Sequence, residues 1–196
     1  MSSNYNFNGI KRAAIIIGID TYPNLDPNLQ LKGATNDADE IYKILKDNGG
    51  FNENDIVILK NDSATRKDII SNLYEILFKK EYENIIFFFA GHGIEDPFND
   101  TFLAPYDFDP SICHLNGILM TQISGLFRNF YRSSTINTHK TICTFLDCCH
   151  SHKLFEGEGR SIDTINIGQK TKDFLESEGQ LGLVSMDFDE IAREKI

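Results

Sequence analysis

The sequence lacks any long hydrophobic run. Its longest apolar stretches, residues 13–17 and 85–90, fall far below the roughly 20 apolar residues that a membrane-spanning helix needs. The polar, Asn-rich N-terminus also lacks an apolar core of the secretory kind. These absences argue against membrane insertion and against export by a signal peptide.

Basic residues are also scarce, with 19 Lys and Arg against 29 Asp and Glu, for a formal net charge of -10. Nucleic acids and anionic membranes bind through basic patches, so neither is expected as the main partner. Of only four cysteines, Cys148 and Cys149 are adjacent, which does not suit a disulfide framework. We therefore expect a reducing, cytoplasmic location.

Short, continuous apolar runs alternate with amphipathic segments along the chain. Continuous apolar runs are typical of strands buried on both faces, and the alternation predicts an α/β fold with a mostly parallel sheet covered by helices on both sides. The expected strands are residues 13–19, 55–59, 85–90 and 141–146, with a shorter apolar segment at 101–104 and a further strand at 181–186. Asn36 is the expected N-cap of the first helix, and Ser63 or Thr65 that of the second.

The composition divides the chain into four parts. Residues 1–11 are polar and expected to be disordered, and residues 12–153 contain the strand–helix alternation. Residues 154–180 are polar and Gly-rich, which predicts a mobile surface loop. Residues 181–196 predict one more strand and the start of a helix.

Two predicted strands lead to side chains that could react. The third is followed by His92 and the fourth by Cys149. Reactive groups of open parallel sheets gather beyond the carboxyl ends of the strands, so neighbouring strands would place imidazole and thiol in one cleft. There the thiolate attacks a carbonyl group and the imidazolium protonates the leaving amine. The alternative is a Gly-His-Gly turn and a packing cysteine, and spacing alone leaves the two interpretations balanced.

A zinc site is the competing chemical interpretation of the same region. Cys148, Cys149, His150 and His152 form a dense group of soft ligands. However, adjacent residues at a strand end point in opposite directions, and no second Cys/His pair has finger-like spacing. The sequence therefore favours the dyad over the metal.

Residues 13 to about 194 resemble the peptidase domain of metacaspases and of their bacterial relatives, the orthocaspases. The resemblance is carried, in order, by the segments AAIIIGIDTYPNL, LKGATNDADEI, FFFAGHG, FLDCCHS and LVSMDFDEIARE. It implies a caspase-like three-layer α/β/α sandwich and a cysteine endopeptidase of the C14 type. His92 then corresponds to the general acid/base and Cys149 to the nucleophile, with the N–H groups of Gly93 and Cys149 as the oxyanion hole. Cys148 falls on a variable position, which favours a packing role.

The resemblance also implies a substrate pocket with two carboxylates, at Asp37 and Asp147. Carboxylates in a partly desolvated pocket attract a guanidinium and repel an aspartate, which predicts cleavage after Arg or Lys. Taken alone, Asp37 could be a first-turn helix acid and Asp147 a solvated carboxylate. Two pocket positions that are often Cys and Ser in metacaspases are Ala34 and Ala90 here, so the pocket is less polar. Strict cleavage after Asp, as in caspases proper, is the less favoured alternative.

Calcium activates many metacaspases, and the resemblance makes Asp107 and Glu156 candidate ligands. The acidic pair that usually precedes the next helix is replaced by the segment Met-Thr-Gln at residues 120–122. Calcium prefers six to eight oxygen ligands, several of them carboxylates, so no strong calcium dependence and no other cofactor is expected.

The resemblance assigns residues 12–153 to a large-subunit-like region, 154–180 to a processing loop and 181–196 to the start of a small-subunit-like region. It implies a further strand and covering helices beyond residue 196, so we expect that this sequence is cut short, is the large fragment of a processed enzyme, or is completed by a partner chain. The loop offers Arg160, Lys170 and Lys172 as candidate self-cleavage sites. The alternative function is a catalytically weak, zymogen-like scaffold that depends on the missing part. Metacaspases are typically monomers, and a monomer that binds protein or peptide substrates is expected.

Overall fold

The computed structural model describes residues 9–98, 100–133, 140–150 and 181–185. Within these ranges, five strands form a parallel sheet in the order β2–β1–β3–β6–β7. Their bounds are Ile56–Lys60 (β2), Arg12–Gly18 (β1), Asn84–Glu95 (β3), Thr141–His150 (β6) and Leu181–Ser185 (β7). The short strands β4 (Thr101–Leu103) and β5 (Ile118–Leu119) add antiparallel pairs at the carboxyl end of β3.

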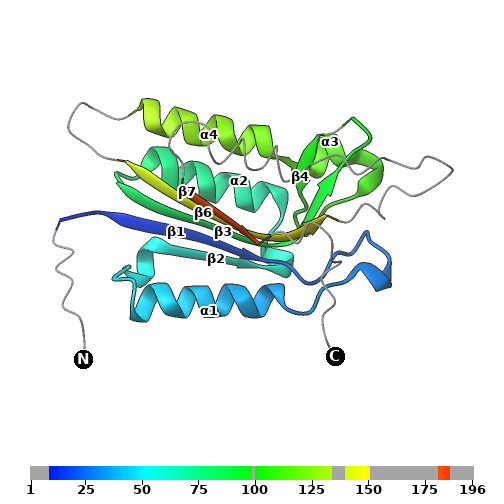
Figure 1. Ribbon diagram of the computed structural model, residues 1–196, viewed down its shortest axis with the longest axis horizontal. Helices are drawn as coiled ribbons and strands as arrows, with labels where there is room; N and C mark the ends of the chain where they lie inside the picture. The colour runs from blue at the N-terminus through cyan, green and yellow to red at the C-terminus, as the bar shows by residue number, and fades with distance from the viewer. Residues whose placement is uncertain (1–8, 99, 134–139, 151–180, 186–196) are drawn as a thin grey trace.

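Helices cover both faces of the sheet, which gives three layers (Figure 1). Helix α1 (Ala34–Asp47) lies on one side, and α2 (Arg66–Tyr74) and α4 (Met120–Arg132) lie on the other. A short helix, α3 (Cys113–Asn116), precedes β5. This α/β/α arrangement confirms the fold class predicted from the sequence.

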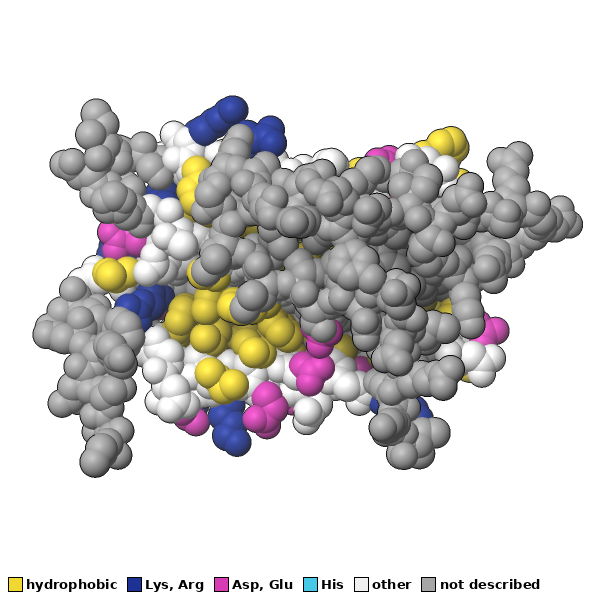
Figure 2. Space-filling view, viewed as in Figure 1, with side chains coloured by type: hydrophobic (Ala, Val, Ile, Leu, Met, Phe, Trp, Pro, Cys, Tyr) yellow, Lys and Arg dark blue, Asp and Glu magenta, His cyan; other side chains and the backbone are white. Residues whose placement is uncertain are grey.

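The core is divided by the sheet into two apolar clusters. The larger contains Phe87 and Phe89 of β3 together with Phe127 and Phe130 of α4. The smaller lies under α1, where Ala34 and Ala38 contact the opposite face of the sheet. Figure 2 shows hydrophobic side chains gathered left of the centre of the view, with acidic side chains beside them. No helix of the described ranges is long and apolar enough to cross a membrane.

The predicted ends of the two chemically important strands were wrong. β3 continues through Gly91, His92 and Gly93 to Glu95, and β6 continues to His150. The extended part of β3 pairs with β4, where Gly93 lies opposite Leu103. His92 and Cys149 therefore lie within paired strands, not in loops beyond them.

The first helix begins earlier than predicted, because its cap comes from a distant residue. Asn36 lies inside α1, and the N-cap position is Gly33. The Asp20 carboxylate, just after β1, accepts the N–H groups of Ala34 (2.8 Å) and Thr35 (3.2 Å). Thr65 is the N-cap of α2, where its side chain accepts the N–H of Asp68. Of the two caps predicted for this helix, Ser63 and Thr65, the second is confirmed.

Helix α1 lies so close to β1 that only glycine fits at position 18. A Cβ there would lie 2.4 Å from the Ala34 carbonyl oxygen and 2.7 Å from the Ala38 Cβ. Close approach therefore fixes the first turn of α1 against the carboxyl end of the sheet. The same end of the sheet carries His92.

We expect Gly18→Ala to lower the free energy of unfolding by about 1–3 kcal/mol, the usual cost of overpacking. Gly125→Ala is the matched control, since nothing lies within 4 Å of its added Cβ in α4. It should raise that free energy by about 0.5–1 kcal/mol through helix propensity. Urea denaturation of both variants measures the difference, and equal shifts would contradict the close packing of α1 on β1.

Candidate active site

The pairing of β3 with β6 places His92 beside Cys149. The two residues are Cα partners in this parallel pair, between Gly91↔Cys148 and Gly93↔His150. Neighbouring strands lie about 4.8 Å apart, so the two backbones are in direct contact. The sequence-based expectation that the two strands are neighbours is therefore confirmed.

The segment between β1 and α1 holds the His92 side chain. Its Nε2 lies 2.6 Å from the Leu29 carbonyl oxygen, and its backbone N–H donates to the Tyr22 hydroxyl at 2.9 Å. The rings of Tyr22 and His92 also contact each other, with centroids 4.8 Å apart. His92 is only 6% exposed, so these contacts fix the imidazole in a buried position.

The side chain of Gln30 stabilises the conformation of the segment between β1 and α1. The Gln30 amide accepts the N–H of Tyr22 at 2.6 Å and donates to the carbonyl oxygens of Tyr22 and Leu25. Tyr22 is completely buried, and a Cβ at Gly91 would lie 2.6 Å from its hydroxyl oxygen. Gly91 is thus required because the tyrosine occupies the space above it.

The contact with Leu29 determines which nitrogen of His92 carries the proton. A carbonyl oxygen can only accept, so Nε2 donates and Nδ1 is the basic nitrogen of the neutral ring. Burial lowers the pKa of His92, and the bond to the Leu29 carbonyl partly offsets this effect. A neutral, oriented imidazole of this kind can accept a proton from a thiol.

The predicted substrate-binding residues lie around α1 and the end of β6. Ala34 and Ala90 are buried in the smaller core cluster, in contact with the same face of the sheet. Asp147 is exposed and is the register partner of Ala90, while Asp37 is half-buried in the first turn of α1. The roles of Asp37 and Asp147, and that of Gly93 in an oxyanion hole, stay predictions.

Other predicted residues have different surroundings. Cys148 is buried in the larger core cluster, as a packing role requires. Asp107 accepts the N–H of Arg66 at 2.8 Å and so satisfies the start of α2. Five further predicted residues lie outside the described ranges: His152, Glu156, Arg160, Lys170 and Lys172.

Sequence reasoning missed Tyr22 and Leu29 as supports of His92, although Tyr22 lies in the first motif of the resemblance and Leu29 lies just after it. A contact made by a backbone carbonyl leaves no signature in residue type. It also missed a second group of reactive side chains, formed by Asp96, Cys113 and His114. The adjacent Cys113 and His114 are a visible signal, but only the folded hairpin brings Asp96 to them.

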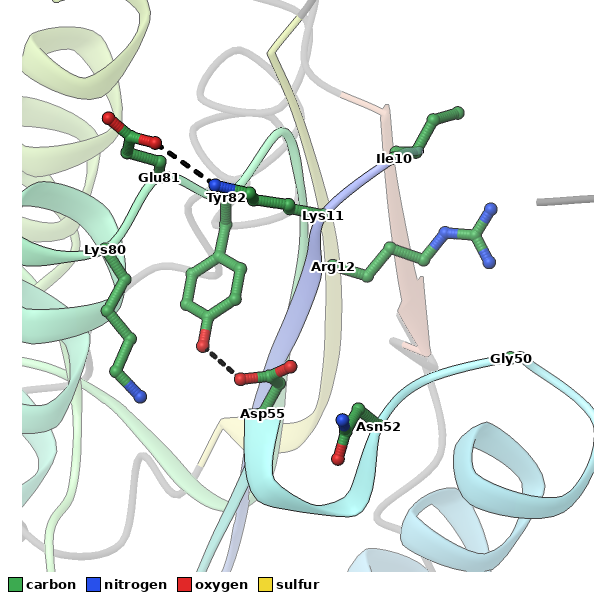
Figure 3. A pocket seen from close by; sticks show the side chains of 9 residues that line it. All are labelled: Ile10, Lys11, Arg12, Gly50, Asn52, Asp55, Lys80, Glu81 and Tyr82. Carbon is green, nitrogen blue, oxygen red and sulfur yellow. Dashed lines mark hydrogen bonds and ion pairs between the residues drawn. The ribbon is translucent and has the colours of Figure 1, made fainter. Parts of the chain in front are cut away.

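The cavity in Figure 3 is separate from this site. It has a volume of about 490 Å³ and lies where β1 begins, near Arg12, Asp55 and Tyr82. Tyr82 donates to the Asp55 carboxylate, and Lys11 is paired with Glu81. Arg12 pairs with Asn84, which is eight residues and about 26 Å along β3 from His92. The cavity therefore lies at the opposite end of the sheet.

The lowered pKa of His92 predicts how stability depends on pH. As the pH falls toward and below the ordinary histidine pKa of 6.5, the unfolded chain binds more protons than the folded one, so folding stability falls as the pH drops. We expect the free energy of unfolding, measured with Cys149→Ala, to decrease between about pH 7.5 and pH 5.5. Adding His92→Gln, which keeps a donor for the Leu29 carbonyl, should flatten this decrease. An unchanged or steeper slope would contradict the burial of a neutral imidazole.

A search of curated proteins found no match. Protein GSU0716 from Geobacter sulfurreducens, a solved structure, is similar with a TM-score of 0.54 and 19% sequence identity. The match covers 72% of this chain and 51% of that one, so this chain spans about half its length, and the likeness concerns the fold. A C14 peptidase family model, described as the caspase domain, matches residues 11–187. The chain therefore belongs to the caspase-domain family of cysteine peptidases.

Proposed function

We propose that this chain is a metacaspase-like cysteine endopeptidase that hydrolyses peptide bonds after Arg or Lys. The observation that carries the proposal is the pairing of His92 with Cys149 across β3 and β6. The Leu29 carbonyl adds a second support, because it orients the imidazole through Nε2. Together they supply a nucleophile and a proton carrier in a chain of a cysteine peptidase family.

In the first half of the proposed reaction, Nδ1 of His92 takes the thiol proton of Cys149. The thiolate attacks the substrate carbonyl carbon, and a C–S bond forms as the carbonyl oxygen becomes an oxyanion. Backbone N–H groups of Gly93 and Cys149 are the proposed donors to that oxyanion. The imidazolium then gives its proton to the leaving amine, and the C–N bond breaks to leave a thioester on Cys149.

In the second half, water replaces the amine. His92 removes a proton from the water as its oxygen attacks the thioester carbonyl. The C–S bond breaks, the new carboxylic acid departs, and the thiol is restored. The bond to the Leu29 carbonyl stabilises the imidazolium in both halves, because a positive N–H donor makes a stronger hydrogen bond than a neutral one.

Specificity for a basic residue would come from Asp147 and Asp37. Asp147 lies two residues before Cys149 on β6 and is exposed, and Ala90 beside it adds no bulk. Asp37 is on the helix that lies over the same end of the sheet. Carboxylates at these positions favour a guanidinium or ammonium group and disfavour an acidic side chain. The net charge of -10 adds a general attraction for basic peptides.

We further propose that the reaction needs no cofactor and no strong calcium activation. The Asp107 carboxylate is engaged with the first N–H of α2 and thus already has a structural role. The residues Met120 and Thr121 begin α4 without adding a carboxylate there. Self-cleavage at Arg160, Lys170 or Lys172, and completion by a small-subunit fragment, stay predictions.

Hydrolysis of matched peptide reporters ending in Arg, Lys or Asp, with and without calcium, tests the proposal. We expect cleavage after Arg or Lys in both conditions and none with Cys149→Ala. Asp147→Asn should lower kcat/KM for the basic reporters about 30-fold, because a bound basic side chain would shield this exposed carboxylate from water, and losing one such charged contact costs about 2 kcal/mol or more.

Asp39→Asn is the matched control, because Asp39 lies on α1 but pairs at the surface with Lys60, 2.8 Å away. It removes the same charge and should leave kcat/KM nearly unchanged. Cleavage only after Asp would refute the pocket while sparing the dyad. A folded protein that cleaves none of the reporters would contradict the peptidase proposal and favour the regulated scaffold.

A further inference from the structure

A second group of reactive side chains lies where the β3–β4 hairpin meets α3. The carboxylate of Asp96, the thiol of Cys113 and the imidazole of His114 each offer a ligand atom, and these atoms lie within 4.8 Å of one another. Asp96 directly follows β3, and the other two residues begin α3. The group therefore joins two segments that are distant along the chain, and it is separate from the His92–Cys149 pair.

Asp96 is held rigidly with one oxygen turned to the other two residues. It is 3% exposed, and its Oδ1 accepts the N–H groups of Phe98 and Asp100, both at 2.9 Å. Its Oδ2 lies 2.7 Å from Nε2 of His114. A buried carboxylate with one oxygen fixed by the backbone is a preorganised ligand, because its second oxygen cannot turn away.

The other two residues complete a mixed donor set. Cys113 is 8% exposed, and burial together with the charge of Asp96 raises the pKa of its thiol. The His114 side chain is about half exposed, at 49%, and its ring contacts Phe102 of β4 edge to face. One side of the group is thus open to solvent, while the sulfur and the carboxylate are buried.

We propose that Asp96, Cys113 and His114 bind a zinc ion or a similar borderline divalent cation. One oxygen, one sulfur and one nitrogen are the ligands that zinc takes in proteins, whereas calcium and magnesium prefer oxygen alone. Three protein ligands leave a fourth tetrahedral position for water, on the side where His114 is exposed. The site requires neither the proposed peptidase activity nor its residues.

The geometry needs only small movements to close around a metal. Tetrahedral zinc with bonds of 2.0–2.3 Å holds its ligand atoms about 3.3–3.7 Å apart. Nε2 and Oδ2, now 2.7 Å apart, must therefore separate by about 0.6 Å. The ligand atoms all lie within 4.8 Å of one another, so none must approach another by more than about 1.5 Å. On binding, the thiol proton goes to solvent, and the metal replaces the hydrogen bond between His114 and Asp96.

Bound metal would fasten the hairpin that begins at His92. The carbonyl of His92 accepts the N–H of Ala104 at 2.9 Å. The pairing of β3 with β4 therefore begins at His92 itself. Asp96 is four residues further along the same hairpin. Metal bound there would fasten the hairpin to α3 and raise the temperature of unfolding.

Cobalt titration of the Cys149→Ala protein tests the site, since Co²⁺ replaces zinc and a thiolate ligand gives it an ultraviolet charge-transfer band. We expect one ion per chain, with the thiolate band and a rise in melting temperature. Cys113→Ser should abolish the band, and Asp96→Asn or His114→Gln should weaken affinity about 10- to 100-fold or more.

Cys143→Ser is the matched control, since Cys143 lies on β6 away from the site and should keep the band. A band that persists in Cys113→Ser, or that disappears equally in Cys143→Ser, would overturn the assignment and place the metal on other thiols. Absence of stoichiometric cobalt binding to the Cys149→Ala protein would overturn it outright. His114→Gln changes a half-exposed side chain, so it gives an answer even if Cys113→Ser fails to fold.

Discussion

The pairing between β3 and β6 is the constraint on which the candidate site depends. β3 lies between β1 and β6, so its register is fixed on both sides. A shift of one residue would turn every side chain of a strand to the other face and bury the wrong set. The apolar side chains of β3 and β6 that pack against α1 on one face and α4 on the other therefore also determine that His92 lies beside Cys149.

The segment after β1 orients the side chain of His92, whose position the strand pairing determines. Asp20 caps α1 through its carboxylate, and its carbonyl accepts the N–H of Leu31 at 2.8 Å. Its own N–H donates to the Asn61 side chain, and Asn61 adopts a positive φ of 44°, which asparagine tolerates better than most residues. One residue thus joins the helix that carries Asp37 to the segment that carries Leu29. Preorganisation of the imidazole and placement of the proposed substrate pocket share the same supports.

The sequence was sufficient to predict the layers and the neighbouring strands, because continuous apolar runs are typical of strands buried on both faces of a parallel sheet. Residues 13–17 and 87–90 are buried, on both sides of the sheet, as the pattern indicates. The pattern failed where pairing is non-local. It ended β3 before His92, because Gly91 and Gly93 look like turn residues until β4 is available as a partner. It assigned the cap of α1 to Asn36, because the true cap, Asp20, comes from another element.

The site was predictable to the extent that it depends on residue type. His92 and Cys149 were predicted as the reactive pair from chemistry, strand position and family resemblance together, and the structure places them on neighbouring strands. The Leu29 carbonyl was not, since any residue carries a carbonyl and only the fold places this one against Nε2. The group at Asp96 was missed for a related reason: a hairpin turn and a short helix bring its members together, and neither has a periodic signal.

Reaction with an Arg-containing peptide that bears an electrophilic terminus tests the central claim most directly, with the modified residue located by peptide mass mapping. The account predicts a single adduct on Cys149, formed at least about 100-fold more slowly in His92→Ala, because proton transfer by a positioned histidine contributes that much or more. An adduct on Cys148 or Cys113 instead, or an equal rate in His92→Ala, would contradict it.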